Sequence, residues 1–244
     1  MRHSFLPYHR ALISQDEIDE VVDTLRSGWL TTGPRVKRFE EDFAAYVGSP
    51  HAVAVSSGTA ALHLSMAAIG VEPGDEVILP TNTFTATAEA IQYVGARPVL
   101  VDCQKDTFNI DIASVAERIT PRTKAIVPVR MAGQPCDMDE LMSIADHNGL
   151  RVVEDAAHAL PASYRGRQIG TIGDLTTFSF YATKTITTGE GGMATSNNEE
   201  YAEKIRLLSL HGISRGAWKR YTAGGSWYYE VLNLGYKDNL TDIA

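Results

Sequence analysis

Residues Phe178 to Gly192 read FSFYATKTITTGEGG, an apolar run followed by one lysine and a glycine-rich turn. The run predicts a buried strand, and the glycines predict a turn that brings the backbone close behind Lys184. Most lysines are solvated, and this chain has 22 Lys and Arg residues in all. Whether Lys184 is a functional residue therefore depends on which other residues of the chain lie beside it.

Short apolar runs alternate with helical segments from His51 onward, as in sheets built from strand, helix, strand units. Seven runs have the composition of buried strands: Ala52 to Val55, Glu76 to Leu79, Pro98 to Asp102, Ala125 to Val129, Val152 to Glu154, Thr176 to Tyr181 and Met193 to Thr195. Helices are expected near Ala60 to Ile69, Ala86 to Val94, Ile112 to Ile119, Met138 to His147 and Glu199 to His211. The pattern predicts a three-layer α/β/α fold, whose mostly parallel, mixed central sheet has about seven strands.

The ends of the chain have a different pattern. Amphipathic helices are expected over Gln15 to Arg26, with Ser14 as N-cap, and over Val36 to Val47. The glycine and proline of SGWLTTGP, residues 27–34, predict a loop between them. The final NLTDIA, residues 239–244, has the composition of the first turn of a helix.

Composition excludes several classes of protein. The formal net charge of −8 argues against a nucleic-acid-binding surface, which needs clustered Lys and Arg. Cys103 and Cys136 lack the spacing of a zinc or disulfide site. The first residues lack the apolar core of a signal peptide, and no apolar run approaches the roughly 20 residues that span a bilayer. We expect a cytoplasmic protein with no metal and no nucleic-acid or membrane partner.

Ligands of open parallel sheets gather outside the carboxyl ends of the strands. Ser56, Ser57, Gly58 and Thr59 follow the first strand and open a helix, where backbone N–H groups can bind phosphate. Taken alone, these residues are more often a simple helix cap.

Three further strand ends carry informative residues. Phe84 is a core residue or stacks on a planar ring, and by itself the core is favoured. Asp155, followed by His158, holds a charged heterocycle or caps a turn. Lys184, preceded by Ser179, becomes a nucleophile able to form a Schiff base if its site lowers its pKa. A phosphate site, an aromatic ring, a carboxylate and a lysine together meet the requirements of pyridoxal phosphate.

In these residues the sequence resembles the DegT/DnrJ/StrS family of sugar aminotransferases, which share the fold of aspartate aminotransferase. The matching motifs are LPYHRALIS, SGWLTTGP, SSGTAALHL, GDEVILPTNTFTATAEA, GARPVLVD, TPRTKAIVPV, VVEDAAHA, FSFYATKTITTGEGG, LHGISR and LGYKDNLTDI. The resemblance covers almost the entire chain, and VVEDAAHA with SFYATK and GEGG is the most specific part.

The resemblance implies a role for each matching residue. Lys184 would form the Schiff base with pyridoxal phosphate and, once freed, move a proton between substrate and cofactor. Asp155 would keep the pyridine nitrogen protonated. The other cofactor contacts would be Phe84 stacked on the ring, His158 beside the phenolic oxygen, and Ser57, Gly58, Thr59 and Ser179 on the phosphate.

The family forms homodimers with shared active sites. Lys237 and Asn239 would therefore reach the partner's cofactor phosphate or nucleotide sugar. The loop residues Trp29, Thr31, Thr32 and Gly33 would line the sugar pocket. The implied division is an N-terminal helix and active-site loop over residues 1–35, a cofactor-binding large domain over 36–215, and an interface segment with a truncated C-terminal region over 216–244.

The implied reaction transfers an amino group from L-glutamate to a keto group of a nucleotide-linked keto-deoxysugar, in amino sugar biosynthesis for polysaccharides or antibiotics. One alternative is a non-catalytic or truncated relative with a regulatory or binding role. Another is a keto-sugar dehydratase, but dehydratases of the family have His in place of the lysine. The sugar, the nucleotide and the aminated carbon are not indicated.

Four features depart from the family pattern. Arg130 and Met131 stand where the family commonly has His followed by an aromatic residue or Leu. Asp238 replaces an aromatic residue, and Phe84 stands where some pentose-aminating members have Trp. We also expect the family's smaller C-terminal domain to be missing.

Overall fold

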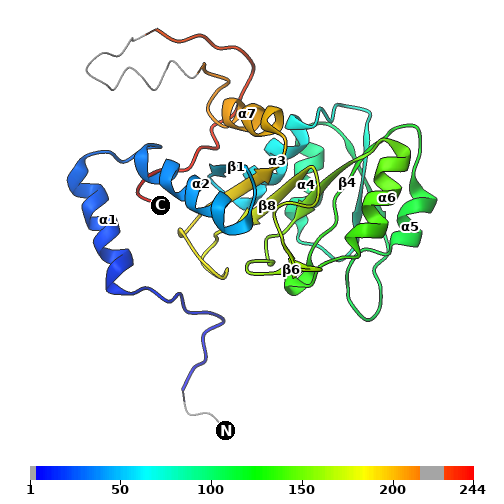
Figure 1. The fold of residues 1–244 in the computed structure, drawn as a ribbon, viewed down its shortest axis with the longest axis horizontal. Helices are drawn as coiled ribbons and strands as arrows, with labels where there is room; N and C mark the ends of the chain where they lie inside the picture. Colours follow the sequence, from blue (N-terminus) through cyan, green and yellow to red (C-terminus); the bar gives the residue numbers. More distant parts are fainter. Residues whose placement is uncertain (1–3, 215–227) are drawn as a thin grey trace.

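A seven-stranded mixed sheet forms the middle layer of the protein (Figure 1). The computed structural model describes residues 4–214 and 228–244, so residues 216–227 of the predicted interface segment lie outside the described residues. The strand order is β3 (Arg97–Val101), β2 (Glu76–Pro80), β4 (Thr123–Ile126), β5 (Arg151–Asp155), β8 (Leu175–Ser179), β9 (Gly192–Ser196) and β1 (His51–Val55). β9 runs antiparallel to the other six strands, which all run in the same direction. All seven predicted strands are present.

Helices cover both faces of the sheet. One face carries α3 (Gly58–Ala68), α4 (Thr85–Tyr93) and α7 (Glu199–Leu208), and the other carries α2 (Pro34–Val47), α5 (Ile112–Arg118) and α6 (Met138–Asn148). Side chains alternate between the two cores along each strand: Val53 and Val55 pack under α3 and α7, whereas Ala52 and Ala54 pack under α2. The predicted three-layer α/β/α architecture is confirmed.

A small hairpin was not predicted. It consists of β6 (Ser163–Tyr164) and β7 (Arg167–Gln168), joined through Arg165 and Gly166, both at positive φ. This backbone suits a two-residue hairpin turn. Strands of two residues with exposed or half-buried side chains have no apolar run, so periodicity carries no signal for them.

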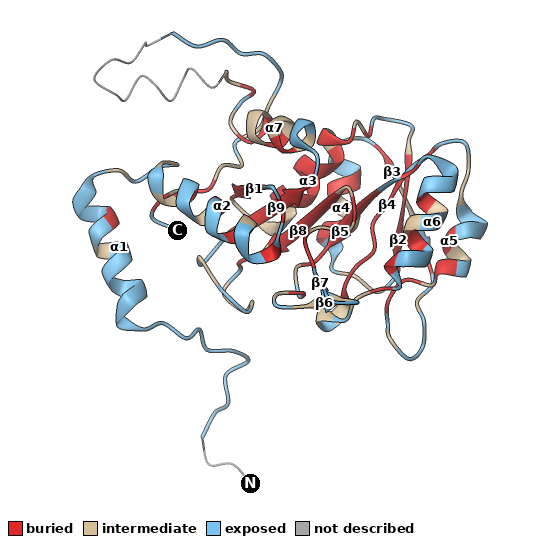
Figure 2. Cartoon of the chain, viewed as in Figure 1, coloured by how far each residue is buried: buried red, intermediate tan, exposed pale blue. Residues whose placement is uncertain are grey.

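Helix α1 (Gln15–Ser27) begins at the predicted N-cap. Ser14 forms a capping box with Glu17, and the helix ends at Gly28 in the left-handed conformation. Its apolar residues Ile18, Val21 and Leu25 are 47%, 41% and 50% exposed. The helix is amphipathic as predicted, yet much of its apolar face stays exposed in the described chain (Figure 2). No helix among the described residues is long and apolar enough to cross a membrane.

Residues 241–244 form a single turn, in which the Ala244 N–H donates to the Thr241 carbonyl (3.2 Å), and no helix is assigned to residues 239–244. Asp242 lies in a turn, where its carboxylate accepts hydrogen bonds from the backbone N–H groups of Gly33 (2.7 Å), Arg35 (3.1 Å) and Val36 (2.9 Å). The N-cap of α2 is Gly33, which has no side chain to accept these N–H groups. The carboxylate of Asp242, far away in the sequence, therefore caps α2. The cap-forming residue of the C-terminal segment acts on this helix and not on a helix of its own segment.

Glu76 is the buried carboxylate of an ion cluster whose two arginines are largely exposed, at the opposite end of the strands from their carboxyl ends. Its carboxylate accepts hydrogen bonds from Thr120 Oγ1 (2.7 Å), Arg122 Nη2 (2.6 Å) and Arg97 Nη2 (2.7 Å), while Glu76 itself is 1% exposed. The parallel register places Glu76 opposite Arg97 on β3 and Thr123 on β4, which brings these partners together. The bonds from Thr120 and Arg122 are the main reason that the pKa of Glu76 falls from 4.5 to about 2.

The cap on α2 predicts a stability change. Replacing Asp242 by Ala leaves three N–H groups without their acceptor, and we expect a loss of about 1–2 kcal/mol in the free energy of unfolding. Asp242→Asn keeps one side-chain oxygen and should lose less. Urea unfolding followed by circular dichroism measures both, and an unchanged midpoint in Asp242→Ala would contradict the capping role.

The Glu76 cluster predicts a dependence of stability on pH. Since the folded-state pKa lies below the unfolded value, this stabilisation is present above about pH 4.5 and is lost as the pH falls toward about 2. Glu76→Gln should lower stability at pH 7 and flatten the curve between these values. Glu72→Gln, at an exposed glutamate nearby, is the control and should leave the curve unchanged.

Candidate active site

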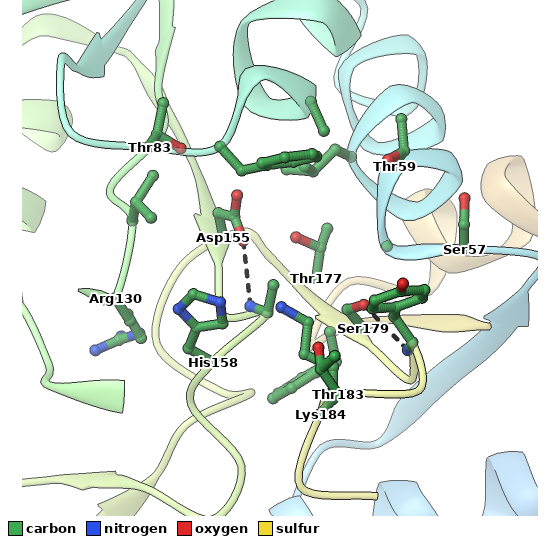
Figure 3. A pocket seen from close by; sticks show the side chains of 18 of the residues that line it. Ser57, Thr59, Thr83, Arg130, Asp155, His158, Thr177, Ser179, Thr183 and Lys184 are labelled. Carbon is green, nitrogen blue, oxygen red and sulfur yellow. Dashed lines mark hydrogen bonds between the residues drawn. The ribbon is translucent and has the colours of Figure 1, made fainter. Parts of the chain in front are cut away.

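The carboxyl ends of β1, β2, β5 and β8 meet at one edge of the sheet, around a pocket of about 690 Å³. Eight predicted cofactor residues line it: Ser57, Gly58, Thr59, Phe84, Asp155, His158, Ser179 and Lys184. Figure 3 shows the side chains of Asp155, His158, Ser179 and Lys184 around one shared space, with Ser57 and Thr59 on the α3 side. The volume is in the range of small-molecule sites.

The N-terminus of α3 forms an anion-binding wall of this pocket. Ser57 caps the helix by accepting a hydrogen bond from the Ala60 N–H (3.0 Å), and the first-turn N–H groups of Gly58 and Thr59 have no intrahelical acceptor. A Cβ on Gly58 would lie 2.9 Å from Ser179 Cβ, so glycine is needed for this close approach. The cap and the phosphate site were considered as alternatives, but the geometry is compatible with both.

Asp155 at the end of β5 is held firmly and is 6% exposed. Its Oδ2 accepts a hydrogen bond from Thr87 Oγ1 (2.8 Å), and its Oδ1 accepts one from the Ala157 N–H (3.1 Å). Each oxygen keeps acceptor capacity, since a carboxylate has about four lone-pair sites. A buried carboxylate with spare acceptors suits a protonated ring nitrogen.

Lys184 is half-buried in the turn after β8, where its backbone N–H donates to the Tyr181 carbonyl (2.8 Å). Burial lowers the pKa of Lys184, and the charge of Asp155 opposes this by raising it. Burial, followed by the charge of Lys184, also lowers the pKa of His158, again against Asp155. The lysine is therefore not an ordinary solvated amine, and a larger fraction of it is neutral and nucleophilic at a given pH.

Phe84 lies at the N-cap of α4 and is 76% exposed on the wall of the pocket. The core position favoured from composition alone was wrong. Phe84 follows the end of β2, beyond the helix and sheet layers that would bury it. Its exposed ring is free to contact a planar ligand.

The remaining predicted residues lie elsewhere, beside the N-terminus of α2 and the edge strand β1. Asn239 Nδ2 donates to Thr32 Oγ1 (2.7 Å), and Lys237 Nζ donates to Asn239 Oδ1 (2.5 Å). Trp29 Nε1 donates to the Thr32 carbonyl (3.1 Å). Within one chain, Trp29, Thr31, Thr32, Gly33, Lys237 and Asn239 do not line the Lys184 pocket. Their assignment to a shared site stays a prediction.

Two residues that line the pocket and one that lies behind Asp155 were missed in the sequence. Tyr8 and His9 line the pocket from the LPYHRALIS stretch, which matched the family but was given no role. Thr87 binds Asp155 and belongs to TFTATAEA, where its four-residue spacing from Thr83 on a helix start was an available signal.

Arg130, a departure from the family pattern, lines the inner wall of the pocket and is fully buried. Its Nη2 donates to Glu154, and burial lowers the pKa of Arg130 to about 10. Nε and Nη1 of Arg130 have no partner among the described residues. In the same described part, no three His, Cys, Asp or Glu residues gather as a metal site.

Three relatives illustrate what this chain resembles. It is 57% identical over 243 residues to the uncharacterized protein MJ1066 of Methanocaldococcus jannaschii, covering 100% of this chain and 63% of that protein. It is 56% identical over 242 residues to the spore coat polysaccharide biosynthesis protein SpsC of Bacillus subtilis, with coverage of 99% and 62%. The putative sugar aminotransferase Spr1654 of Streptococcus pneumoniae, solved in a PMP-form, superposes with a TM-score of 0.92 at 42% identity, with coverage of 98% and 65%.

The chain spans less than two thirds of the length of each of these relatives. The superposition confirms the aspartate aminotransferase-like fold expected from the sequence. A family model matches residues 11–244, which include the whole lysine pocket apart from Tyr8 and His9. By this match the chain belongs to the DegT/DnrJ/EryC1/StrS aminotransferase family.

Proposed function

We propose that this protein is a pyridoxal phosphate-dependent aminotransferase that moves an amino group from L-glutamate to a keto group of a nucleotide-linked keto-deoxysugar. The observation that carries the proposal is the placement of Lys184 and Asp155 in one pocket with the N-terminus of α3. Family membership supports it, as do a relative named for polysaccharide biosynthesis and a similar structure named as a sugar aminotransferase.

The pocket fits the chemical groups of this cofactor. The glycine-containing turn at Gly58 leaves room for a phosphate, and a side chain there would close that room against Ser179. Asp155 offers a buried carboxylate to a ring nitrogen, and Phe84 offers an exposed ring to its plane. When bound, pyridoxal phosphate supplies an electron sink for negative charge developing on a substrate carbon.

The residues divide the remaining work. Lys184 would hold the cofactor through Nζ and then accept and return a proton, a task that its lowered pKa favours. Asp155 would keep a proton on the ring nitrogen by its charge. Ser57, Gly58, Thr59 and Ser179 would fix the phosphate. His158, whose pKa is lowered, would be a neutral neighbour able to donate one N–H group.

The substrate side of the proposal involves a second copy of the chain. We place Lys237 and Asn239 at a partner's cofactor phosphate or nucleotide sugar in a homodimer, and residues 29–33 along the sugar. Their position outside the Lys184 pocket supports this, because in their own chain they have no access to it. The proposed location is the cytoplasm.

The dehydratase alternative requires His where this chain has Lys184. A non-catalytic relative would keep the pocket but not the reaction. Measuring the first half-reaction, which needs no sugar, therefore separates an enzyme from a binding protein.

The role proposed for Lys184 predicts where the cofactor becomes attached and how fast it reacts. After reconstitution with pyridoxal phosphate, borohydride should attach the cofactor to Lys184, as located by peptide mass spectrometry. L-glutamate should then convert unreduced cofactor to its amine form, at least about 100-fold more slowly in Lys184→Ala. Lys105→Ala, at an exposed loop lysine, is the control and should behave as wild type. Attachment at another lysine would exclude the proposed role.

The charge of Asp155 predicts a change at Lys184. Because Asp155 raises the pKa of Lys184 against the effect of burial, Asp155→Asn should lower that pKa further. The amine would then become neutral at a lower pH. The rate of Lys184 modification by trinitrobenzenesulfonate against pH, in protein without cofactor, measures the midpoint. Asp146→Asn, at an exposed aspartate, is the control; an unchanged midpoint in Asp155→Asn would contradict the coupling.

A further inference from the structure

Two threonine hydroxyls form a chain behind Asp155. Thr83 Oγ1 lies 2.6 Å from Thr87 Oγ1, and Thr87 Oγ1 donates to Asp155 Oδ2 at 2.8 Å. Thr83 lines the pocket, whereas Thr87 is 1% exposed and does not. Thr87 can therefore reach a ligand only through Asp155.

The bond from Thr87 is unusual for a hydroxyl in a helix. Such hydroxyls commonly donate to the carbonyl one turn earlier. Two others in this chain do so: Thr24 donates to the Glu20 carbonyl (2.8 Å), and Ser65 donates to the Ala61 carbonyl (2.7 Å). Thr87 instead donates to a carboxylate that is 68 positions away in the sequence. Helix packing alone does not require this bond.

The hydrogen bonds from Thr83 to Thr87 to Asp155 have a fixed donor-to-acceptor direction. A carboxylate only accepts hydrogen bonds, so the single hydroxyl proton of Thr87 goes to Asp155. Thr83 must then donate its own proton to Thr87, and its oxygen presents only lone pairs to the pocket. Any ligand group that binds Thr83 Oγ1 must therefore be a donor.

We propose that Thr87 is a positioning residue that fixes the orientation and charge of Asp155, and that Thr83 acts through Thr87. The role rests on the proposed function, in which Asp155 holds a proton on the cofactor's ring nitrogen. Thr87 holds Oδ2 while the Ala157 N–H holds Oδ1, so the carboxylate plane cannot turn freely. The spare acceptor positions of both oxygens then have defined directions.

Removing the hydroxyl of Thr87 has two consequences. The carboxylate loses one of its two fixed contacts and gains freedom to rotate. It also loses a donor that stabilises its charged form, so a proton shared with a ring nitrogen moves toward Asp155. The ring nitrogen then carries less positive charge, which weakens the electron sink.

The same hydrogen bonds connect Asp155 to the start of α4. Phe84 lies between Thr83 and Thr87, and the Thr87 N–H donates to the Phe84 carbonyl (3.2 Å). The residue proposed to stack on the ring and the residue proposed to hold its nitrogen are thus linked through one residue, Thr87, by its backbone N–H and its hydroxyl. A shift of the first turn of α4 would move both.

The test compares Thr87→Val, which keeps the shape but removes the hydroxyl, with Thr87→Ser, which keeps the hydroxyl. Each protein is loaded with pyridoxal phosphate labelled with 15N at the ring nitrogen. In Thr87→Val the 15N resonance should move toward the value of neutral pyridine, and the glutamate half-reaction should slow by about 10-fold. Thr87→Ser should restore both. Thr85→Val, on the same turn but bonded outward to Glu89, is the matched control.

A variant at Thr83 provides a second test. Thr83→Val should move the 15N resonance in the same direction by a smaller amount, because it acts only by polarising Thr87. The double variant should equal Thr87→Val. If Thr87→Val does not fold, Thr87→Ala, which also removes the hydroxyl, takes its place.

An unmoved 15N resonance in Thr87→Val, or in Thr87→Ala where that variant replaces it, would overturn the proposal and leave Thr87 as a packing residue. Thermal unfolding is recorded beside it, since packing defects lower the melting temperature without changing the ring nitrogen. Borohydride attachment to Lys184 in the wild type tests the proposed function separately. Its failure would reject the cofactor assignment, whereas its success with an unmoved resonance rejects only the role of Thr87.

Discussion

The parallel pairing of β5 between β4 and β8 is the constraint on which the candidate site depends. In register, Ile126 lies opposite Val152, and Asp155 lies opposite Thr177 two residues before Ser179. These strands run in the same direction, so their carboxyl ends lie at the same edge of the sheet. Asp155 and Ser179, at the ends of β5 and β8, therefore lie at that edge. The backbone also fixes Asp155 beyond the ladder: its N–H donates to the Pro128 carbonyl (2.9 Å), and its carbonyl accepts from the Arg130 N–H (3.0 Å). Lys184 then needs only a short turn after β8 to face Asp155.

Burial gives these residues their chemical character. A carboxylate and an amine in water have ordinary proton affinities, but here a half-buried lysine experiences both the loss of water and the charge of Asp155. The two effects oppose each other, so the amine is made easier to deprotonate without being fixed in the neutral state. Arg130, on the inner wall of the same pocket, forms a buried pair with Glu154, and Glu154 also accepts a hydrogen bond from the Gly173 N–H (2.7 Å). Removing either member alone would leave the other as an uncompensated buried charge.

Much of the fold could be predicted because buried strands and amphipathic helices leave periodic apolar patterns. The strand-end argument also grouped Ser57, Asp155, Ser179 and Lys184 correctly around one pocket. What the sequence did not give is the contact between distant side chains. Thr87 to Asp155 and Asp242 to α2 join residues far apart in the chain, and threonine and aspartate have ordinary local roles that mask such contacts. The core position favoured for Phe84 from composition alone was wrong for a related reason. Its exposure depends on where β2 ends, whereas an aromatic residue taken in isolation favours the core.

The cap that Asp242 places on α2 also couples two segments that the sequence keeps apart. Gly33 and Thr32 are held by Asp242 and Leu240, and Thr32 in turn is held by Asn239. The loop before α2 and the stretch around Asn239 therefore behave as one mechanical body. A substitution that breaks these bonds on one segment would therefore also loosen the other.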